Sequence, residues 1–133
     1  MKNKKFTDKA LAQLALDASK QTYSPYSHFP VGAALETDSQ IFLGTNVENA
    51  SYGLTICAER NAVFAAVAAG ERKFKRLAVA APTKQFILPC GGCLQVVSEF
   101  CDDLPLILVN ADLKIKKTSL KKLLTSPFRS LRK

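Results

Sequence analysis

Cys57-Ala58-Glu59-Arg60 lies at the start of a strongly predicted helix over 56–69, for which Thr55 is the expected N-cap. A second stretch, Pro89-Cys90-Gly91-Gly92-Cys93, opens another predicted helix that extends over 90–100. Together the two stretches hold three thiols and one carboxylate, about thirty residues apart in the chain. The elements around them must therefore bring the two helix starts together.

The flanking segments predict short strands that alternate with helices. Residues 31–36 and 41–45 are apolar runs separated by a polar turn, which predicts a β-hairpin. Asn46 and Glu48 continue the second strand, with both side chains on one face, where they could reach one ligand. The other expected elements are a helix over 7–21 with Thr7 as N-cap, a loop over 23–30, strands over 75–81 and 105–110, and a final helix over 119–124. This order predicts a layered α/β domain, with a mixed sheet covered by helices.

Length and hydropathy limit the class of protein. A chain of 133 residues fits a single domain over 1–133, and its hydrophobic residues, 47% of the total, occur in runs too short to span a membrane. The basic start of the chain lacks the apolar core of a signal peptide, so we expect a cytoplasmic protein. Four cysteines in that compartment stay reduced, which favours metal binding or catalysis over disulfides.

The formal net charge of +8 raises an alternative of a different class, a zinc-stabilised nucleic-acid-binding module. The basic residues gather at the two ends of the chain, where a solvated tail or helix face explains them equally well. They are Lys2, Lys4, Lys5, Lys114, Lys116, Lys117, Lys121, Lys122, Arg129, Arg132 and Lys133.

The spacing of the cysteines favours a catalytic zinc site. Cys90 and Cys93 are three apart on a helical turn, so they can share one metal, and Cys57 supplies a third ligand. Cys101 lies eight residues beyond Cys93, a rise of about 12 Å along a helix, and cannot be the fourth ligand. Three protein ligands leave a fourth position for water, which is typical of catalytic rather than structural zinc.

Glu59 and Arg60 then acquire expected roles. A carboxylate beside an open zinc position can act as general acid and base. Three thiolates leave the divalent cation with a net charge of about −1, which Arg60 and the two helix N-termini can offset. Either stretch alone has other readings, because Pro-Cys-x-x-Cys also occurs in redox pairs and zinc ribbons. The combination of both stretches favours catalysis.

The motifs resemble those of the zinc-dependent nucleoside deaminases, in particular the small homotetrameric cytidine deaminases. The resemblance extends from Tyr23 to about Phe128 and also includes residues 25–34 and 46–52. It implies a three-layer α/β/α sandwich with a mixed, mainly five-stranded sheet, and one Zn²⁺ per subunit. It further implies sites completed across subunits, with no nucleic acid and no membrane as partner.

The resemblance also assigns site residues. Cys57, Cys90 and Cys93 become the zinc ligands, and Glu59 becomes the proton shuttle for attack of water on carbon 4 of cytosine. The residues that match substrate contacts are Asn46 and Glu48 for the ribose, Phe29 for the base, Ala58, and Phe128, which reaches a neighbouring subunit's site. His28 is expected to be a structural loop residue.

The sequence departs from the family at Leu94, where an arginine commonly follows the last ligand. Two explanations stay open: Arg60 and the helix dipoles alone offset the thiolate charge, or apolar packing replaces a contact between subunits.

The expected function is hydrolysis of cytidine and deoxycytidine to uridine and deoxyuridine in pyrimidine salvage. Within the same chemistry, the alternative is a cytosine-containing antibiotic nucleoside as substrate. A deaminase of bases within RNA is a third reading, which the predicted sugar contacts of Asn46 and Glu48 disfavour.

Overall fold

The computed structural model describes residues 6–130 of the chain. The predicted basic residues Lys2, Lys4, Lys5, Arg132 and Lys133 lie outside this range. The elements in chain order are α1 (Asp8–Ala18), a 3₁₀ turn (Ser19–Gln21), β1 (Gly32–Thr37), β2 (Ile41–Thr45), a second 3₁₀ turn (Tyr52–Leu54), α2 (Ala58–Ala68), β3 (Phe74–Ala80), α3 (Gly91–Ser98), β4 (Pro105–Val109), β5 (Ile115–Ser119) and α4 (Leu120–Leu123). Within 6–130, no helix is long and apolar enough to cross a membrane.

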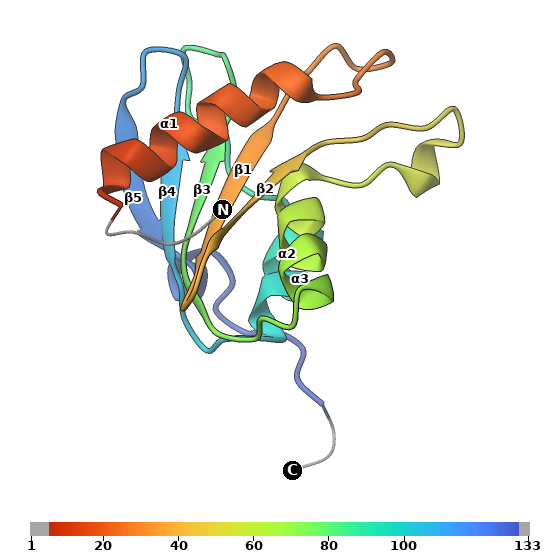
Figure 1. The fold of residues 1–133 in the computed structure, drawn as a ribbon. Coiled ribbons are helices and arrows are strands. Elements are labelled where there is room, and N and C mark those ends of the chain that lie inside the picture. The colour runs from red at the N-terminus through yellow and green to blue at the C-terminus, as the bar shows by residue number, and fades with distance from the viewer. Residues whose placement is uncertain (1–5, 131–133) are drawn as a thin grey trace.

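The strands form one mixed sheet in the order β2-β1-β3-β4-β5. The central pair, β3 and β4, is parallel and joined through α3, whereas the other neighbours are antiparallel. Helix α1 crosses one face of the sheet, and α2 and α3 lie side by side against the other (Figure 1). The predicted three-layer α/β/α arrangement with a five-stranded mixed sheet is therefore confirmed.

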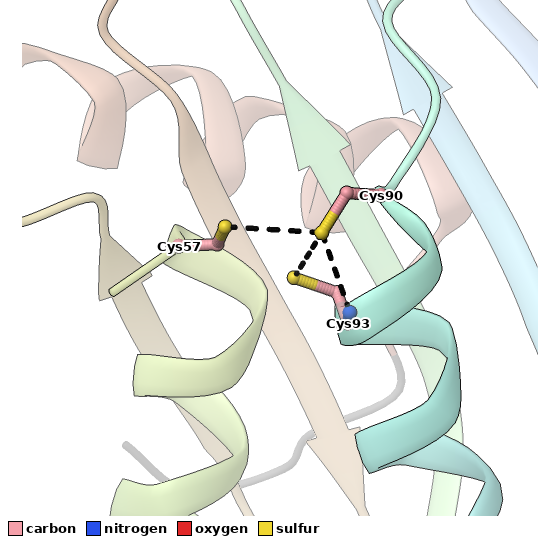
Figure 2. Close-up of side chains that lie close together, drawn as sticks. All are labelled: Cys57, Cys90 and Cys93. Atoms are coloured by element: carbon pink, nitrogen blue, oxygen red, sulfur yellow. Dashed lines mark hydrogen bonds between the residues drawn. The ribbon is translucent and has the colours of Figure 1, made fainter. Parts of the chain in front are cut away.

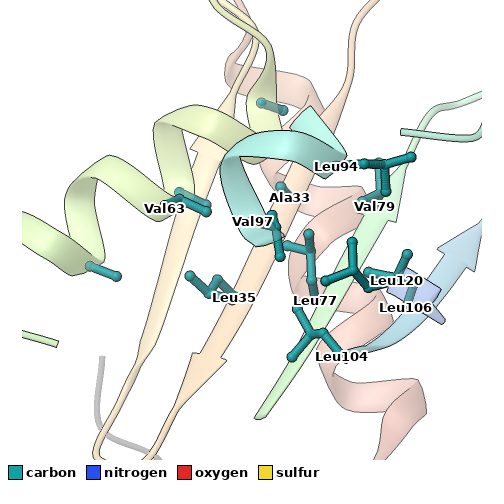
Figure 3. Packing of buried hydrophobic residues seen from close by; sticks show 13 residues of the cluster. Ala33, Leu35, Val63, Leu77, Val79, Leu94, Val97, Leu104, Leu106 and Leu120 are labelled. Atoms are coloured by element: carbon teal, nitrogen blue, oxygen red, sulfur yellow. The ribbon is translucent and has the colours of Figure 1, made fainter. Parts of the chain in front are cut away.

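Strand residues alternate between two cores, one on each face of the sheet. Ala33 and Leu35 of β1 pack into the cluster under α2 and α3 (Figure 3), whereas Ala34 between them packs under α1. Leu77 and Ala78 divide in the same way in β3. This alternation follows from the two-residue period of a strand, and burial on both faces explains why the central strands read as unbroken apolar runs.

Two glycines set how closely the helices approach the sheet. A Cβ on Gly32 would lie 2.0 Å from the Ala15 carbonyl oxygen of α1, and one on Gly44 would lie 2.2 Å from the Ala58 carbonyl oxygen of α2. The absence of a side chain at Gly44 therefore lets the first turn of α2 rest directly on β2.

Most predicted boundaries agree with the structure to within a few residues, and Thr7 caps α1 by accepting a hydrogen bond from the Ala10 amide at 3.0 Å. The predicted cap of the second helix was wrong. Cys57, not Thr55, is the N-cap of α2, because Ile56 is held in an extended conformation by paired backbone hydrogen bonds with Val47.

Strand β5 was missed by the sequence analysis. Its residues, Ile115-Lys116-Lys117-Thr118-Ser119, include a single strongly apolar side chain, and they form the edge of the sheet against β4. Lysines on an edge strand are expected, since they discourage pairing with another chain. Part of the basic C-terminal segment is thus the exposed side of a strand and not a tail.

Arg76 joins three segments that are distant in the sequence. Its guanidinium donates to Glu36 at 2.6 Å, to Asp8 at 2.7 Å and to the Phe6 carbonyl oxygen at 2.7 Å. Hydrogen bonds from Lys117 and Arg76 hold the pKa of Asp8 below its ordinary value. The stabilisation from Asp8 is therefore present at neutral pH and is lost as the pH falls through that lowered pKa.

Arg76→Leu is expected to destabilise the protein by about 3 kcal/mol, because it leaves the carboxylate of Glu36, only 7% exposed, without its partner. Urea denaturation would measure the loss. Lys75→Leu is the matched control, since it removes the same charge from the exposed neighbouring position on β3 and should cost far less. Equal losses for the two variants would contradict the role of Arg76.

Candidate metal centre and active site

The three predicted thiols meet between the starts of α2 and α3. Cys57 is the N-cap of α2 and Cys90 is the N-cap of α3, while Cys93 lies in the first turn of α3. Figure 2 shows their sulfur atoms directed toward one another from the two helices. Among residues 6–130, they form the one cluster of at least three Cys, His, Asp or Glu side chains that could hold a metal ion.

The spacing of the sulfurs fits zinc. The Cys57 and Cys90 sulfurs lie 4.0 Å apart, the Cys90 and Cys93 sulfurs lie 3.4 Å apart, and all three lie within 4.8 Å of one another. Tetrahedral coordination with Zn–S bonds of about 2.3 Å places sulfurs about 3.8 Å apart. Movements of a few tenths of an ångström to an ångström would therefore seat the ion, and thiolates are ligands that zinc prefers.

The electrostatics around the sulfurs favour negative charge. A hydrogen bond with Cys93, together with one from Arg60, lowers the pKa of the Cys57 thiol to about 5. The Arg60 Nη2 atom lies 3.2 Å from the Cys57 sulfur. The Cys90 sulfur accepts a hydrogen bond from the Cys93 amide at 3.4 Å, as an N-cap side chain does. The thiolate form of Cys57 is thus stabilised before any metal binds.

Arg60→Met is expected to weaken zinc affinity about 10- to 100-fold, because it removes a cation hydrogen-bonded to a candidate ligand. Competition with a chromophoric zinc chelator would measure the change. Arg72→Met provides the comparison, since Arg72 is exposed and its Nη1 atom donates to the backbone carbonyls of Val67 and Glu71, at the far end of α2 from the thiols. Zinc affinities equal to wild type in both variants would contradict the charge-compensating role of Arg60.

Glu59 lies in the first turn of α2 and is only 4% exposed. Burial raises the pKa of its carboxyl group, and the neighbouring Cys57 thiolate raises it further. A raised pKa makes a carboxyl group hold a proton more readily, which suits a group that has to accept a proton and pass it on. A hydrogen bond with Cys93 brings the Glu59 carboxyl group to the edge of the thiol cluster. The three sulfurs lie close enough together to hold a metal ion without Glu59 as a ligand.

Beside the thiols, a cavity of about 460 Å³ opens to solvent. Cys57, Glu59 and Cys90 form part of its lining. Four of the residues predicted to contact substrate also line it: Phe29, Asn46, Glu48 and Ala58. The volume lies within the range of small-molecule sites, about 300 to 1,000 Å³.

Asn46 is fixed by the loop that precedes β1. Its Oδ1 atom accepts from the Val31 amide at 2.9 Å, and its Nδ2 atom donates to the Phe29 carbonyl oxygen at 2.9 Å. These bonds leave the side chain 8% exposed at the wall of the cavity. Asn46 therefore also sets the position of Phe29.

Glu48 is held by the same loop. Its carboxylate accepts from the amides of Tyr26 and Ser27, at 3.0 and 3.1 Å, and from the Ser27 hydroxyl. His28 adopts the left-handed region at φ 54°, consistent with the structural loop role expected for it. The loop is thus shaped around the Glu48 carboxylate.

Five further residues line the cavity without having been predicted as site residues: Ser27, Val31, Thr55, Ile87 and Leu88. They belong to loops, where neither helical nor strand periodicity marks a residue as facing a site. The sequence does hold one signal for Leu88. Together with Ile87 it forms an apolar pair directly before Pro89-Cys90, which places an apolar side chain next to a candidate metal ligand.

Phe128 does not line the cavity of its own chain. Its side chain is 70% exposed, and its peptide is hydrogen-bonded to Gln95 of α3. The structure of one chain thus brings together all the predicted site residues except this one.

Neither Leu94 nor Cys101 belongs to the cluster of three thiols. Leu94 is 6% exposed and belongs to the core cluster under α2 and α3 (Figure 3). Apolar packing within the chain thus occupies the position where arginine is common, which leaves Arg60 as the neighbouring cation. The half-buried thiol of Cys101 donates to the Val97 carbonyl oxygen, and burial raises the pKa of this thiol to about 11.

Comparison with known proteins agrees with this geometry. The sequence model described as "Cytidine and deoxycytidylate deaminase zinc-binding region" matches residues 5–107. The chain belongs to this deaminase family. The match spans both cysteine stretches, so the three thiols, which could hold a metal ion, lie within the zinc-binding region that this model describes.

Individual deaminases are similar over most of their length. The cytidine deaminase of Sporosarcina psychrophila is 50% identical over 113 residues, which cover 84% of this chain and 83% of the relative. The crystal structure of cytidine deaminase from Burkholderia pseudomallei superposes with a TM-score of 0.88 at 46% identity, covering 92% of this chain and all of that one. A blasticidin-S deaminase of Bacillus cereus is more distant, at 28% identity over 126 residues.

Proposed function

We propose that this deaminase hydrolyses cytidine and deoxycytidine to uridine and deoxyuridine with release of ammonia. The observation that carries the proposal is that one nucleoside-sized cavity is lined by a buried glutamate and by members of a three-thiol cluster. Relatives named cytidine deaminase, at up to 50% identity, support the substrate.

The proposed ligands are Cys57, Cys90 and Cys93, which would hold one zinc ion per chain. When bound at such a three-ligand site, zinc supplies a water activated for nucleophilic attack at neutral pH. Cys101 is not part of the cluster, so the cysteines do not provide a closed four-ligand site. A zinc-stabilised nucleic-acid-binding module needs such a closed site, which disfavours that alternative.

Glu59 is the proposed carrier of protons. It takes a proton from the attacking water and delivers it to ring nitrogen 3 of cytosine. It then takes the proton of the new hydroxyl group on carbon 4 and passes it to the exocyclic amino group, which leaves as ammonia when the carbon–nitrogen bond breaks. Its burial and raised pKa support this role, because the same carboxyl group must alternate between acid and base.

The remaining cavity residues orient the nucleoside. Glu48 and Asn46 are proposed to hydrogen-bond the ribose hydroxyls, and Phe29 to pack on the base. Ala58, in the first turn of α2, has a backbone N–H with no partner within its helix and can donate it to the base. These roles agree with the placement of all four residues on the cavity wall.

The decisive experiment combines metal analysis with the change in ultraviolet absorbance on conversion of cytidine to uridine. One zinc per chain and turnover of cytidine are expected. A folded, zinc-loaded protein that leaves cytidine unchanged would overturn the proposal. Competition between cytidine and a cytosine-containing antibiotic nucleoside would test the alternative substrate, which the lower identity to the blasticidin-S deaminase disfavours.

The proposal extends to assembly and cellular role. We propose a cytoplasmic homotetramer that acts in pyrimidine salvage, with Phe128 reaching the site of a neighbouring subunit. The exposure of Phe128, and its absence from the cavity of its own chain, support a contact in trans. Light scattering would measure the assembly, and a fully active monomer would contradict it.

A further inference from the structure

The C-terminal segment is attached to α3 through the side chain of Gln95. The Nε2 atom of Gln95 donates to the Phe128 carbonyl oxygen at 2.8 Å, and its Oε1 atom accepts from the Phe128 amide at 3.0 Å. A primary amide carries a donor and an acceptor side by side, so it can satisfy both polar groups of one residue's backbone. Gln95 therefore binds the backbone of Phe128 and leaves its ring free.

The attachment continues one residue further along the chain. Arg129 donates to the Ser98 carbonyl oxygen of the same helix and lies 3.7 Å from the Asp102 carboxylate. The segment around Phe128 is thus held at successive points along α3. Because Cys90 and Cys93 lie at the start of α3, the position of the Phe128 backbone is fixed relative to the thiol cluster of its own chain.

An exposed aromatic ring on a fixed backbone is prepared for contact outside its own chain. Phe128 is 70% exposed, although both its backbone N–H and its carbonyl oxygen are hydrogen-bonded to Gln95. Fixing the backbone that carries the ring reduces the entropy lost when the ring packs on a ligand. The entropy of the Phe128 backbone is already lost within the chain, because the two hydrogen bonds from Gln95 fix it before any ligand binds.

We infer that Gln95 is a positioning residue for substrate binding, which holds Phe128 in place for the nucleoside site of a neighbouring copy of this chain. The inference rests on the proposed contact of Phe128 across subunits. Gln95 contributes through Phe128 and does not itself touch the substrate.

A double-mutant cycle tests this inference, with cytidine KM and kcat measured for wild type, Gln95→Leu, Phe128→Ala and the double variant. Gln95→Leu is expected to raise KM about fivefold to tenfold, with a smaller fall in kcat, since it removes two hydrogen bonds. Phe128→Ala is expected to raise KM at least as much. In the Phe128→Ala background, Gln95→Leu should then have no further effect, because its only route to the substrate is gone.

Two further measurements separate positioning from a general loss of structure. Hydrogen exchange at the Phe128 amide should become faster in Gln95→Leu, while zinc content and thermal stability stay close to wild type. Gln95→Glu retains the length and the acceptor but sets a carboxylate against the Phe128 carbonyl, so KM should rise here too. Gln13→Leu, on the exposed side of α1, is the control and should leave KM unchanged.

Three outcomes would overturn the inference. One is an unchanged KM in Gln95→Leu, and another is the same rise in KM with or without the Phe128 ring. A Phe128→Ala variant with wild-type KM, in an active enzyme, would contradict the inference alone. A wild-type protein inert toward cytidine would contradict the proposed function itself, so the two failures are distinguishable.

Discussion

Glu59→Gln is expected to lower kcat for cytidine by about 10⁴-fold while zinc stays bound. The amide keeps the size and the buried position of the carboxyl group but can neither accept a proton from water nor pass one to the base. We place the loss at the upper end of the range for general acid–base catalysis because Glu59 is proposed to move more than one proton. The measurement is steady-state turnover together with metal content.

Glu99→Gln is the matched control. Glu99 is an exposed carboxylate at the C-terminal end of α3, whereas Cys90 and Cys93 lie at the start of that helix. This variant should retain wild-type turnover. A Glu59→Gln protein with zinc bound and with kcat within tenfold of wild type would show that the proton moves by another route.

Cys90→Ser is expected to abolish zinc retention after dialysis and, with it, detectable turnover. The Cys90 sulfur lies 4.0 Å from that of Cys57 and 3.4 Å from that of Cys93, so it is close to both of the other candidate ligands. A serine hydroxyl is a far weaker zinc ligand than a thiolate, although it can still cap α3. Cys90→Ser should therefore remain folded although it no longer retains zinc.

Cys101→Ser tests whether the effect belongs to the cluster. Cys101 is half-buried on the same side of the sheet but lies outside the one three-member metal group found among residues 6–130. It should keep one zinc per chain, and stability should change only modestly. Loss of zinc in Cys101→Ser, or its retention in Cys90→Ser, would contradict the assignment of the three ligands.

The sequence predicted the elements with strong periodicity and missed those shaped by their neighbours. The central strands are buried on both faces, so their apolar runs were clear. Strand β5 carries two lysines in five residues and is defined by pairing with β4, which no local pattern reveals. Likewise, Thr55 has the right chemistry for a cap, but the bridge between Val47 and Ile56 delays the start of α2.

The site divides in the same manner. The thiols and Glu59 were predictable because ligand spacing and helix starts are local features of the sequence. The multiple hydrogen bonds of Asn46 and Glu48 depend on the loop before β1 folding back against them. The hydrogen bonds between Gln95 and Phe128 join residues that are 33 apart in the sequence, and no local sequence pattern in either segment predicts them.

The order of the thiols along the chain has a consequence for how the protein acquires its metal. Cys57 precedes β3, whereas Cys90 and Cys93 follow it, and β3 pairs with both β1 and β4. Cys90 and Cys93 become neighbours as soon as α3 forms, but Cys57 joins them only after these long-range pairings, which are slow to form. All three thiols are therefore expected to bind zinc only late in folding, after these strands have paired. Zinc should then lower the unfolding rate much more than it raises the folding rate.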